Sequence, residues 1–384
     1  MSRLRAPREP VFDDGATLGR HTFVASDGRH LHVYGELRGV PSGEAQPAQR
    51  PTGLHKRRDL LTGAWVAVSP ARNVRPHSGL PANDGEDAAC PFCPGGAEMP
   101  ISYEAAVLDN RFPSFVANPP PVAADARLGP AAGRCEVVLY TERHSGSLAT
   151  LTPMELARVV AIWRDRTTEL WADPGDRFVM VFENRGEAVG ATLSHPHGQI
   201  YAFDHLPPLI AERATMLHAF RGTHAACLAC HVVGIDDRSE RAVEANDAFV
   251  VAVPFAARWP FEVHVRARRH GLGRLADLTS VEQRDLAAAL RAVVIRYDRL
   301  FDLELPYMMV ALEAPEGETD WHLAFEFYPP HRGPQLTKVR ASVETATGLF
   351  INDTLPEANA RRLAELPESR LEERPAFTVI RADA

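Results

Sequence analysis

The chain has 384 residues, which is too long for one ordinary domain and suits two or three domains of about 100–200 residues each. Its composition is that of a globular protein with a full core, and its net charge of −8 argues against a general nucleic-acid-binding protein. No apolar run of about 18 residues exists, so no membrane span is expected. The basic residues 1–10 precede no apolar core, so no secretory signal is expected and the predicted compartment is the cytoplasm.

Residues 1–55 are expected to form an N-terminal extension. Ser26-Asp27-Gly28-Arg29 is a turn signal between two short segments with strand character, residues 22–24 and 31–34, and therefore predicts a hairpin. Residues 39–51 are rich in Gly, Pro, Gln and Ala, which is typical of a linker.

After residue 55 the sequence predicts the same strand–helix–strand unit twice. Residues 136–144 and 262–270 alternate like strands, and both run from a glutamate to a histidine. Each is followed by a capping box, at 152–155 and 279–282, which predicts the first turn of a helix. The strands expected after these helices are 177–183 and 195–203 in the first half, and 307–313 and 322–328 in the second.

This repeat predicts an α+β fold of two tandem domains, each an antiparallel sheet with packed helices. Two copies are too few for a solenoid, so a duplicated domain is the better interpretation. The expected limits are residues 56–210 for the first domain and 211–365 for the second, followed by a tail of 366–384.

Four of the five cysteines form two Cys-x-x-Cys pairs, one at the start of each half, and each pair is followed by two histidines at matching places. A Cys-x-x-Cys turn holds two thiolates at the spacing of a tetrahedral metal site, and closed four-ligand sites are structural rather than catalytic. A buried or redox-active dithiol is the alternative, but the matching histidines favour metal. Cys135 has no such partner and is expected to be a buried thiol. The predicted ligands are Cys90, Cys93, His144 and His195 in the first half, and Cys227, Cys230, His270 and His322 in the second.

Ser194-His-Pro-His-Gly-Gln199 is the sharpest motif in the chain. On a strand, residues two apart point to the same side, so His197 would stand beside His195 as a nucleophile toward phosphorus. Gly198 would let a ligand approach the backbone, and Gln199 could donate to an anionic oxygen without adding charge. The rest of a phosphate cradle could come from upstream residues, namely Asn184, Gly190 and Thr192.

The two halves differ at the nucleophile. When His195 is aligned with His322, His197 falls on Ala324 and Gln199 falls on Glu326. The second half therefore keeps the predicted metal ligand and loses the reactive histidine, as expected of a duplicated enzyme with one active half.

These residues resemble the galactose-1-phosphate uridylyltransferase family, within the histidine-triad superfamily. His195-Pro-His-Gly-Gln199 is similar to that family's active-site motif, in which Gln marks transferases. The likeness runs from about residue 56 to about residue 365. The further matching segments are Trp65–Pro70 with Arg72 and Arg75-Pro76, Asn110-Arg-Phe112, Phe182–Gly186 and Phe327–Pro330.

The resemblance implies two histidine-triad-like half-barrel domains, the second degenerate, and a homodimer. It implies that the first Cys/His set binds structural zinc, that His197 takes the uridylyl group and that Gln199 holds the phosphoryl oxygens. The implied substrate-binding residues are Arg72, Arg75, Asn110, Asn184, Gly190 and Thr192 for the nucleotide and phosphates, and Lys338, Val339 and Glu344 for the sugar.

The sequence departs from the family in three respects. Members with iron carry a His-x-His where this chain has Ala324 and Glu326, so the usual iron ligands are missing, whereas the second Cys/His set offers another metal site. An aromatic residue and a Gln expected near Val343 and Phe350 are absent, which leaves the hexose open. Some relatives with two zinc sites resemble nucleotide-sugar phosphorylases.

The predicted reaction is a ping-pong transfer that converts UDP-glucose and galactose 1-phosphate into glucose 1-phosphate and UDP-galactose. Two alternatives stay open. The first is a phosphorylase that cleaves ADP-glucose with phosphate on the same His197. The second is a zinc-binding module without enzymatic activity, against which the acidic charge and the intact His-Pro-His-Gly-Gln motif both argue.

Overall fold

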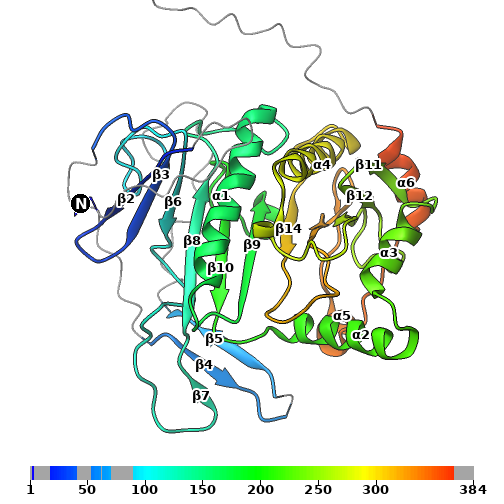
Figure 1. Cartoon of the computed structure of the whole chain (residues 1–384), viewed down its shortest axis with the longest axis horizontal. Coiled ribbons are helices and arrows are strands. Elements are labelled where there is room, and N and C mark those ends of the chain that lie inside the picture. Colours follow the sequence, from blue (N-terminus) through cyan, green and yellow to red (C-terminus); the bar gives the residue numbers. More distant parts are fainter. Residues whose placement is uncertain (1, 4–17, 41–52, 62, 71–89, 367–384) are drawn as a thin grey trace, which may run out of the picture.

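The structure is a computed structural model that describes residues 2–3, 18–40, 53–61, 63–70 and 90–366. Its centre is one twelve-stranded sheet in which every neighbouring pair of strands is antiparallel (Figure 1). In spatial order the first seven strands are β1 (Ser2–Arg3), β2 (Arg20–Val24), β3 (His30–Tyr34), β6 (Ala105–Asp109), β8 (Gly133–Leu139), β10 (His197–Phe203) and β9 (Phe178–Arg185). The other five are β14 (Tyr307–Leu312), β15 (Ala324–Tyr328), β13 (Val263–Ala267), β12 (Phe249–Ala252) and β11 (Ala242–Ala245).

Two long helices, α1 (Pro153–Trp171) and α4 (Ser280–Leu300), lie side by side against this sheet (Figure 1). Both begin at the predicted capping boxes, because Thr152 and Thr279 accept a hydrogen bond from the backbone N–H three residues on while the glutamate there reaches back. The remaining helices are α2 (Pro208–His224), α3 (Leu228–Asp236), α5 (Ser342–Thr347), α6 (Pro356–Ala364) and the short 3₁₀ helices η3 (Glu187–Val189) and η4 (Leu275–Asp277).

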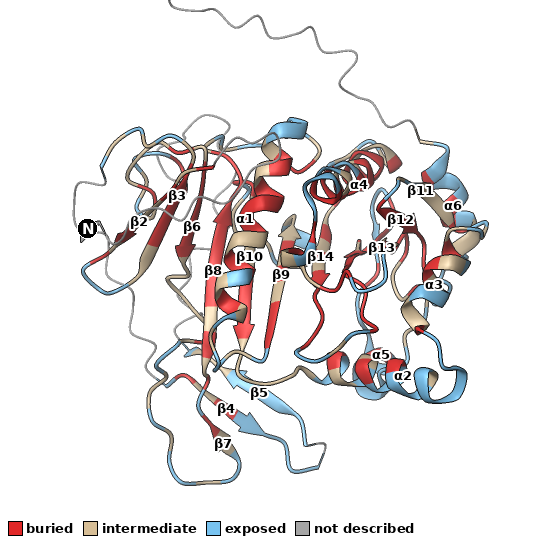
Figure 2. Cartoon of the chain, viewed as in Figure 1, coloured by how far each residue is buried: buried red, intermediate tan, exposed pale blue. Residues whose placement is uncertain are grey.

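The α+β class and the repeated unit are confirmed, but the two halves share one sheet and one core. β9 of the first half pairs with β14 of the second, with Glu183 opposite Met309. Above that junction Trp163 of α1 packs on Phe325 of β15, with ring centroids 5.8 Å apart. Buried residues accordingly run without a break across the central strands and the inner faces of α1 and α4 (Figure 2).

The predicted N-terminal hairpin is present as β2 and β3, and it extends the main sheet because β3 pairs with β6. Arg20 and Tyr34 also bind Asp165 of α1, at 3.1 and 2.6 Å. A smaller sheet projects at one end of the molecule, where β5 is largely exposed (Figures 1 and 2). Its strands are β4 (His55–Arg58), β5 (Trp65–Val68) and β7 (Leu128–Gly129), and a separate pair is β16 (His331–Gly333) with β17 (Leu336–Thr337).

The four predicted histidine ligands lie beyond the strands, which corrects the expectation that they sit on them. β8 ends at Leu139 and β13 at Ala267, before His144 and His270. β10 and β15 begin only after His195 and His322. The reason is that carbonyl groups here point at histidine rings: Thr141 O lies 2.9 Å from His195 Nε2, and Ala267 O lies 2.7 Å from His322 Nδ1.

None of the helices in the described part of the chain combines the length and the apolar character that crossing a membrane requires. The domain limits inferred from the sequence stay predictions.

Candidate active site and metal clusters

The first four predicted metal ligands converge. The ligand atoms of Cys90, Cys93, His144 and His195 all lie within 4.8 Å of one another. Cys93 Sγ is 3.4 Å from His144 Nδ1 and 3.7 Å from His195 Nδ1. A tetrahedral zinc ion with ordinary bond lengths holds sulfur and nitrogen ligands about 3.5 Å apart. The donor set and its spacing therefore fit zinc.

The outer contacts of His195 prepare its ring to bind a cation. The side chain is buried, and burial lowers its pKa to about 4, so the ring is neutral. Nε2 lies 2.9 Å from the carbonyl of Thr141 and from the hydroxyl of Tyr103, and that hydroxyl donates to Phe92 O at 2.7 Å. These contacts assign the proton to Nε2 and leave Nδ1 facing the cysteines.

The second set also converges. Cys227, Cys230, His270 and His322 have their ligand atoms within 4.8 Å, and Cys230 Sγ is 3.5 Å from His270 Nδ1 and 3.3 Å from His322 Nε2. Both cysteines lie at the start of α3, where Cys227 is the N-cap. The donor set and its spacing therefore fit zinc here as well. The two clusters differ in burial, because Cys230 is exposed whereas both cysteines of the first cluster are buried.

His197 is the first residue of β10 and is held through one ring nitrogen. Its Nδ1 lies 2.7 Å from the carbonyl of His195, which assigns the proton to Nδ1 and leaves a lone pair on Nε2. Burial lowers the pKa of His197 while this hydrogen bond opposes the shift, so the ring is neutral near pH 7. The Phe92 ring lies between the two histidines, with centroids 5.4 Å from His197 and 5.9 Å from His195. The candidate nucleophile thus contacts the ligand His195 through its backbone carbonyl and, by way of Phe92, through its ring.

Gln199 and Asn110 are brought together, as the resemblance implies. Asn110 Nδ2 donates to Gln199 Oε1 at 3.5 Å, while Asn110 Oδ1 accepts from the backbone N–H of Phe112 at 2.8 Å. This arrangement turns the Gln199 NH₂ group away from Asn110, so it is available to an anionic oxygen.

The other predicted phosphate residues lie on the chain that leads into β10. β9 pairs with β10 with Phe182 opposite Gln199, and extending that register by two residues places Asn184 opposite His197. Gly190 ends η3 with φ 79°, a left-handed conformation that favours glycine, and Thr192 follows in the loop. Their contact with substrate stays a prediction.

Packing gives a reason for Gly198 that the sequence did not show. A Cβ atom at this position would lie 2.2 Å from the Tyr140 hydroxyl and 3.1 Å from Phe182 O. The glycine is therefore required by packing inside the protein, and the approach of a ligand to its backbone stays a prediction. Sequence reasoning missed the residues beneath it, Tyr140, Glu183 and Tyr307, although Glu183 stands inside one of the family-like segments.

The residues expected to bind the sugar lie around α5. Lys338 is buried and donates to the Glu344 carboxylate and to Ile351 O. The hydrogen bond from Lys338 lowers the pKa of Glu344 to about 2. Val339 is 74% exposed. Lys338 and Glu344 thus bind each other within this chain. Arg72 and Arg75 lie outside the described residues.

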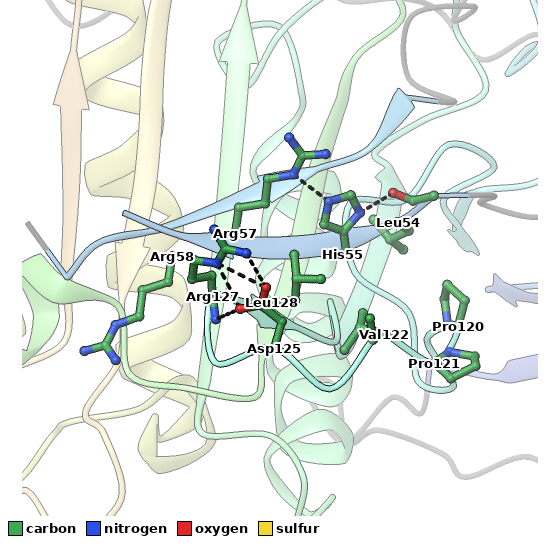
Figure 3. A pocket seen from close by; sticks show the side chains of 12 residues that line it. Leu54, His55, Arg57, Arg58, Pro120, Pro121, Val122, Asp125, Arg127 and Leu128 are labelled. Carbon is green, nitrogen blue, oxygen red and sulfur yellow. Dashed lines mark hydrogen bonds and ion pairs between the residues drawn. The ribbon is translucent and has the colours of Figure 1, made fainter. Parts of the chain in front are cut away.

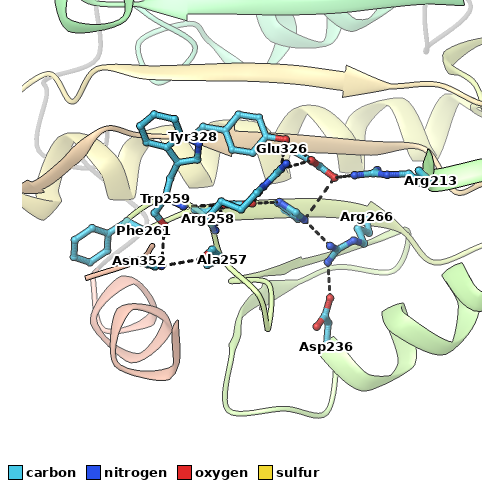
Figure 4. A network of polar contacts seen from close by, with 12 residues as sticks. Arg213, Asp236, Ala257, Arg258, Trp259, Phe261, Arg266, Glu326, Tyr328 and Asn352 are labelled. Atoms are coloured by element: carbon cyan, nitrogen blue, oxygen red, sulfur yellow. Dashed lines mark hydrogen bonds and ion pairs between the residues drawn. The ribbon is translucent and has the colours of Figure 1, made fainter. Parts of the chain in front are cut away.

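The second half carries an ionic network where the first carries its reactive histidine (Figure 4). Glu326 is buried and accepts from Arg213 of α2 at 2.7 Å and from Tyr328, and its carboxylate lies 3.5 Å from Arg258. Burial alone would raise the pKa of Glu326, but His264 and the arginines hold it below its usual value. Ala324 has no polar side chain to replace His197.

A further hollow lies beside β4 and β7 (Figure 3). It is lined by the basic side chains of His55, Arg57, Arg58 and Arg127, of which Arg127 pairs with Asp125, and by Pro120 and Pro121. None of these residues was predicted from the sequence to belong to a binding or catalytic site.

Comparisons with known proteins show the family of the chain. The family model "Galactose-1-phosphate uridyl transferase, N-terminal domain" matches residues 44–207, and the corresponding C-terminal domain model matches residues 213–374. A galactose-1-phosphate uridylyltransferase from Thermotoga maritima is 39% identical over 320 residues, which cover 81% of this chain and 98% of the relative. A probable galactose-1-phosphate uridylyltransferase of Drosophila melanogaster is 32% identical, over 81% of this chain and 95% of that protein.

Two solved structures share the fold. One, described as the structure of uridylyltransferase, has a TM-score of 0.73 at 30% identity and covers 81% of this chain and 97% of its own. The other is an ADP-glucose phosphorylase from Arabidopsis thaliana with bound ADP-glucose, which has a TM-score of 0.63 at 24% identity and covers 81% of this chain and 99% of its own.

Proposed function

The chain belongs to the galactose-1-phosphate uridylyltransferase family, and from that premise we propose that it transfers a uridylyl group from UDP-glucose to galactose 1-phosphate through His197. The observation that carries the proposal is the ring of His197, neutral and fixed through Nδ1, with Nε2 left as the nucleophile. The ring lies beside a Cys/His cluster, to which Phe92 and the His195 carbonyl connect it.

In the first half-reaction, His197 Nε2 attacks the α-phosphorus of UDP-glucose. A P–N bond forms, the bond from that phosphorus to the bridging oxygen breaks, and glucose 1-phosphate leaves with the electron pair. The ring gains positive charge, which the His195 carbonyl stabilises through the Nδ1 proton. In the second half-reaction, a phosphate oxygen of galactose 1-phosphate attacks the same phosphorus, the P–N bond breaks, and UDP-galactose forms.

Gln199 and Asn110 would act on the phosphoryl group. With its oxygen engaged by Asn110, Gln199 presents its NH₂ group as a neutral donor. Arg72, Arg75, Asn184, Gly190 and Thr192 would complete the pocket, and Lys338, Val339 and Glu344 would contribute to sugar binding. The proposed work of all these groups is positioning and charge stabilisation, the main sources of rate in phosphoryl transfer.

The test is a label-transfer experiment with α-³²P UDP-glucose. The wild-type protein should become labelled and release one glucose 1-phosphate per site, whereas His197→Gly should do neither. With free imidazole, His197→Gly should stay unlabelled and should instead release glucose 1-phosphate and form labelled uridylyl-imidazole in solution. The substituted protein should keep its metal content and its melting temperature. Full exchange by His197→Gly without imidazole would contradict the mechanism.

A phosphorylase that uses ADP-glucose is the alternative. It rests on a shared fold with the Arabidopsis protein and on the engagement of Lys338 by Glu344, which keeps this lysine from a hexose in the structure described. A panel with UDP-glucose or ADP-glucose as donor, and galactose 1-phosphate or phosphate as acceptor, separates the two reactions. Turnover only with ADP-glucose and phosphate would favour the alternative.

Zinc in both clusters is part of the proposal, and sulfur–nitrogen distances of 3.3–3.9 Å support it. Bound there, zinc would supply structural cross-links, with four protein ligands and none left for substrate. We expect two zinc ions per chain by elemental analysis.

A homodimer and a cytoplasmic location complete the proposal. Exposed apolar side chains lie around α5, as expected of a surface that a second copy covers: Leu336, Val339, Leu349 and Ile351. None of the five cysteines forms a disulfide, as expected in a reducing compartment. Light scattering on the eluted protein tests the dimer.

A further inference from the structure

A carboxylate is buried directly behind the catalytic strand. Glu183 lies on β9, its side chain is buried, and it accepts hydrogen bonds from the hydroxyls of Tyr140 at 2.9 Å and Tyr307 at 2.7 Å. Arg185, two residues on, pairs instead with Asp298 at 2.6 Å. Two neutral donors are a weak compensation for burying a carboxylate, and burial raises the pKa of Glu183. Such a group needs a reason beyond stability.

The two tyrosines come from opposite sides of the sheet's centre. Tyr140 follows β8 of the first half, and its N–H donates to Pro196 O at 3.2 Å. Tyr307 begins β14 of the second half, where its ring packs on Phe327 with centroids 5.4 Å apart. The contacts of Tyr140, Glu183 and Tyr307 therefore join four neighbouring strands, β8, β10, β9 and β14, across the boundary between the halves.

The hydroxyl of Tyr140 reaches Glu183 by crossing Gly198. Gly198 pairs with Val138 on one side, and extending the β9 register by one residue places it opposite Glu183 on the other. Because Gly198 has no side chain, the Tyr140 hydroxyl can pass close to its backbone. A Cβ atom at this position would lie 2.2 Å from that hydroxyl oxygen. Successive residues of a strand face opposite ways, so His197 and Gln199 project from the other side of this strand.

We propose that Tyr140 and Glu183 form a carboxylate clamp, anchored to β14 by Tyr307. In this clamp the Tyr140 hydroxyl holds the backbone at Gly198 and thereby sets the positions of His197 and Gln199. Glu183 and Tyr140 are positioning residues, since neither faces the substrate side. The inference rests on the proposed function, because it assigns a kinetic consequence to a structural contact.

The test compares two matched substitutions, Tyr140→Phe and Tyr307→Phe, in the full-length zinc-loaded protein. Each removes one hydroxyl bonded to Glu183 from an equally buried ring, so both should lower the melting temperature by similar amounts. Only Tyr140 lies against Gly198. We expect Tyr140→Phe to lower the rate of uridylylation and kcat about tenfold with KM nearly unchanged, and Tyr307→Phe to lower them less than about threefold. Equal losses of kcat, or none in either, would overturn the clamp.

A second pair tests the crossing itself. Gly198→Ala should force β10 and the tyrosine apart and lower kcat, and adding Tyr140→Phe to it should recover part of that loss by removing the crowded oxygen. Strictly additive losses would contradict the proposal. If Tyr140→Phe does not fold, Glu183→Gln replaces it: this near-isosteric change should keep the fold and lower kcat, and an unchanged kcat would refute the clamp.

Failure of the proposed function can be told apart. If the wild-type protein takes no label from UDP-glucose, the function is wrong, and the clamp is tested by the rate at which diethyl pyrocarbonate modifies His197. Tyr140→Phe should change that rate and Tyr307→Phe should not. Equal rates in the three proteins would overturn the clamp on its own.

Discussion

The two halves of the sheet use equivalent strands for different purposes. On β10, His197 and Gln199 keep neutral side chains whose reactive atoms are available, whereas on β15 Glu326 is bound within an ionic network. The metal clusters differ in parallel: His195 faces its cysteines with Nδ1 and His322 with Nε2. The comparison teaches that, on equivalent strands, only the first half places an uncharged histidine beside its Cys/His cluster, which is the arrangement that the proposed reaction requires.

The largest effect is expected from Cys93→Ala. It should remove zinc from the first cluster, lower the free energy of unfolding by several kcal/mol and reduce kcat about 100-fold, since the cluster fixes His195 and, through Phe92, contacts His197. Metal analysis, thermal unfolding and turnover measure these losses. The control is Cys135→Ala, because Cys135 is buried but belongs to neither cluster. Retention of full activity after loss of this metal would contradict the conclusion that the first cluster supports the reactive histidine.

A smaller effect on activity is expected from Cys230→Ala. One zinc should be lost and the melting temperature should fall, but kcat should change less than about threefold because the second cluster lies in the half without the nucleophile. Its exposed cysteine should also make this cluster the first to yield metal to a chelator. A loss of kcat as large as that of Cys93→Ala would show that the two clusters act alike.

Glu326→Gln tests the ionic network. It leaves the side chains of Arg213, Arg258 and His264 without their carboxylate, so the free energy of unfolding should fall by about 2 kcal/mol while kcat of the folded protein stays unchanged. The matched control is Asp353→Asn, which breaks an exposed pair with Arg332 and should cost less than about 1 kcal/mol. Equal costs in the two variants would contradict the structural role of the network.

The smallest effects concern pH. Burial raises the pKa of Glu313 to about 7, so the folded state binds its proton more tightly than the unfolded state does, and stability falls as pH rises from about 4.5 to 7. Glu313→Gln should therefore stabilise the protein by about 1–2 kcal/mol at pH 8 and have little effect at pH 4.

Glu169 should behave in the opposite way. Burial alone would raise the pKa of Glu169, but Arg20 and Arg166 lower it to about 2. The stability that the ionised Glu169 contributes to the folded state is therefore present above about pH 4.5 and is lost as pH falls toward 2. Glu169→Gln should then destabilise at pH 7. Urea unfolding of both variants at several pH values measures the contrast, and a shared pH profile would show that at least one of the two carboxylates lacks the surroundings described.

Much of this architecture was readable in the sequence. The repeat and both capping boxes are confirmed, and both predicted Cys/His sets converge, because hydrogen-bonded caps and Cys-x-x-Cys turns depend on residues close in the chain. The placement of His144 and His270 on strands was wrong, since a strand's end depends on where its neighbour's carbonyls point.

The contacts missed from the sequence link distant segments. The pairing of β9 with β14 and the meeting of Tyr140, Glu183 and Tyr307 depend on register and tertiary packing, which local patterns do not encode. Gly198 was noticed in the sequence motif. The packing reason for a glycine there is the Tyr140 hydroxyl that crosses the strand, and it becomes clear only when the neighbouring strands are in place.

The pairing of β9 with β14 has a consequence for how the chain folds and how it can be divided. Each half supplies the strand that covers the other's open edge. A fragment ending near residue 210, or one beginning there, would expose a row of unpaired amide and carbonyl groups flanked by apolar side chains, which is a template for aggregation. The duplicated halves have therefore become mutually dependent, and we expect unfolding in a single cooperative transition.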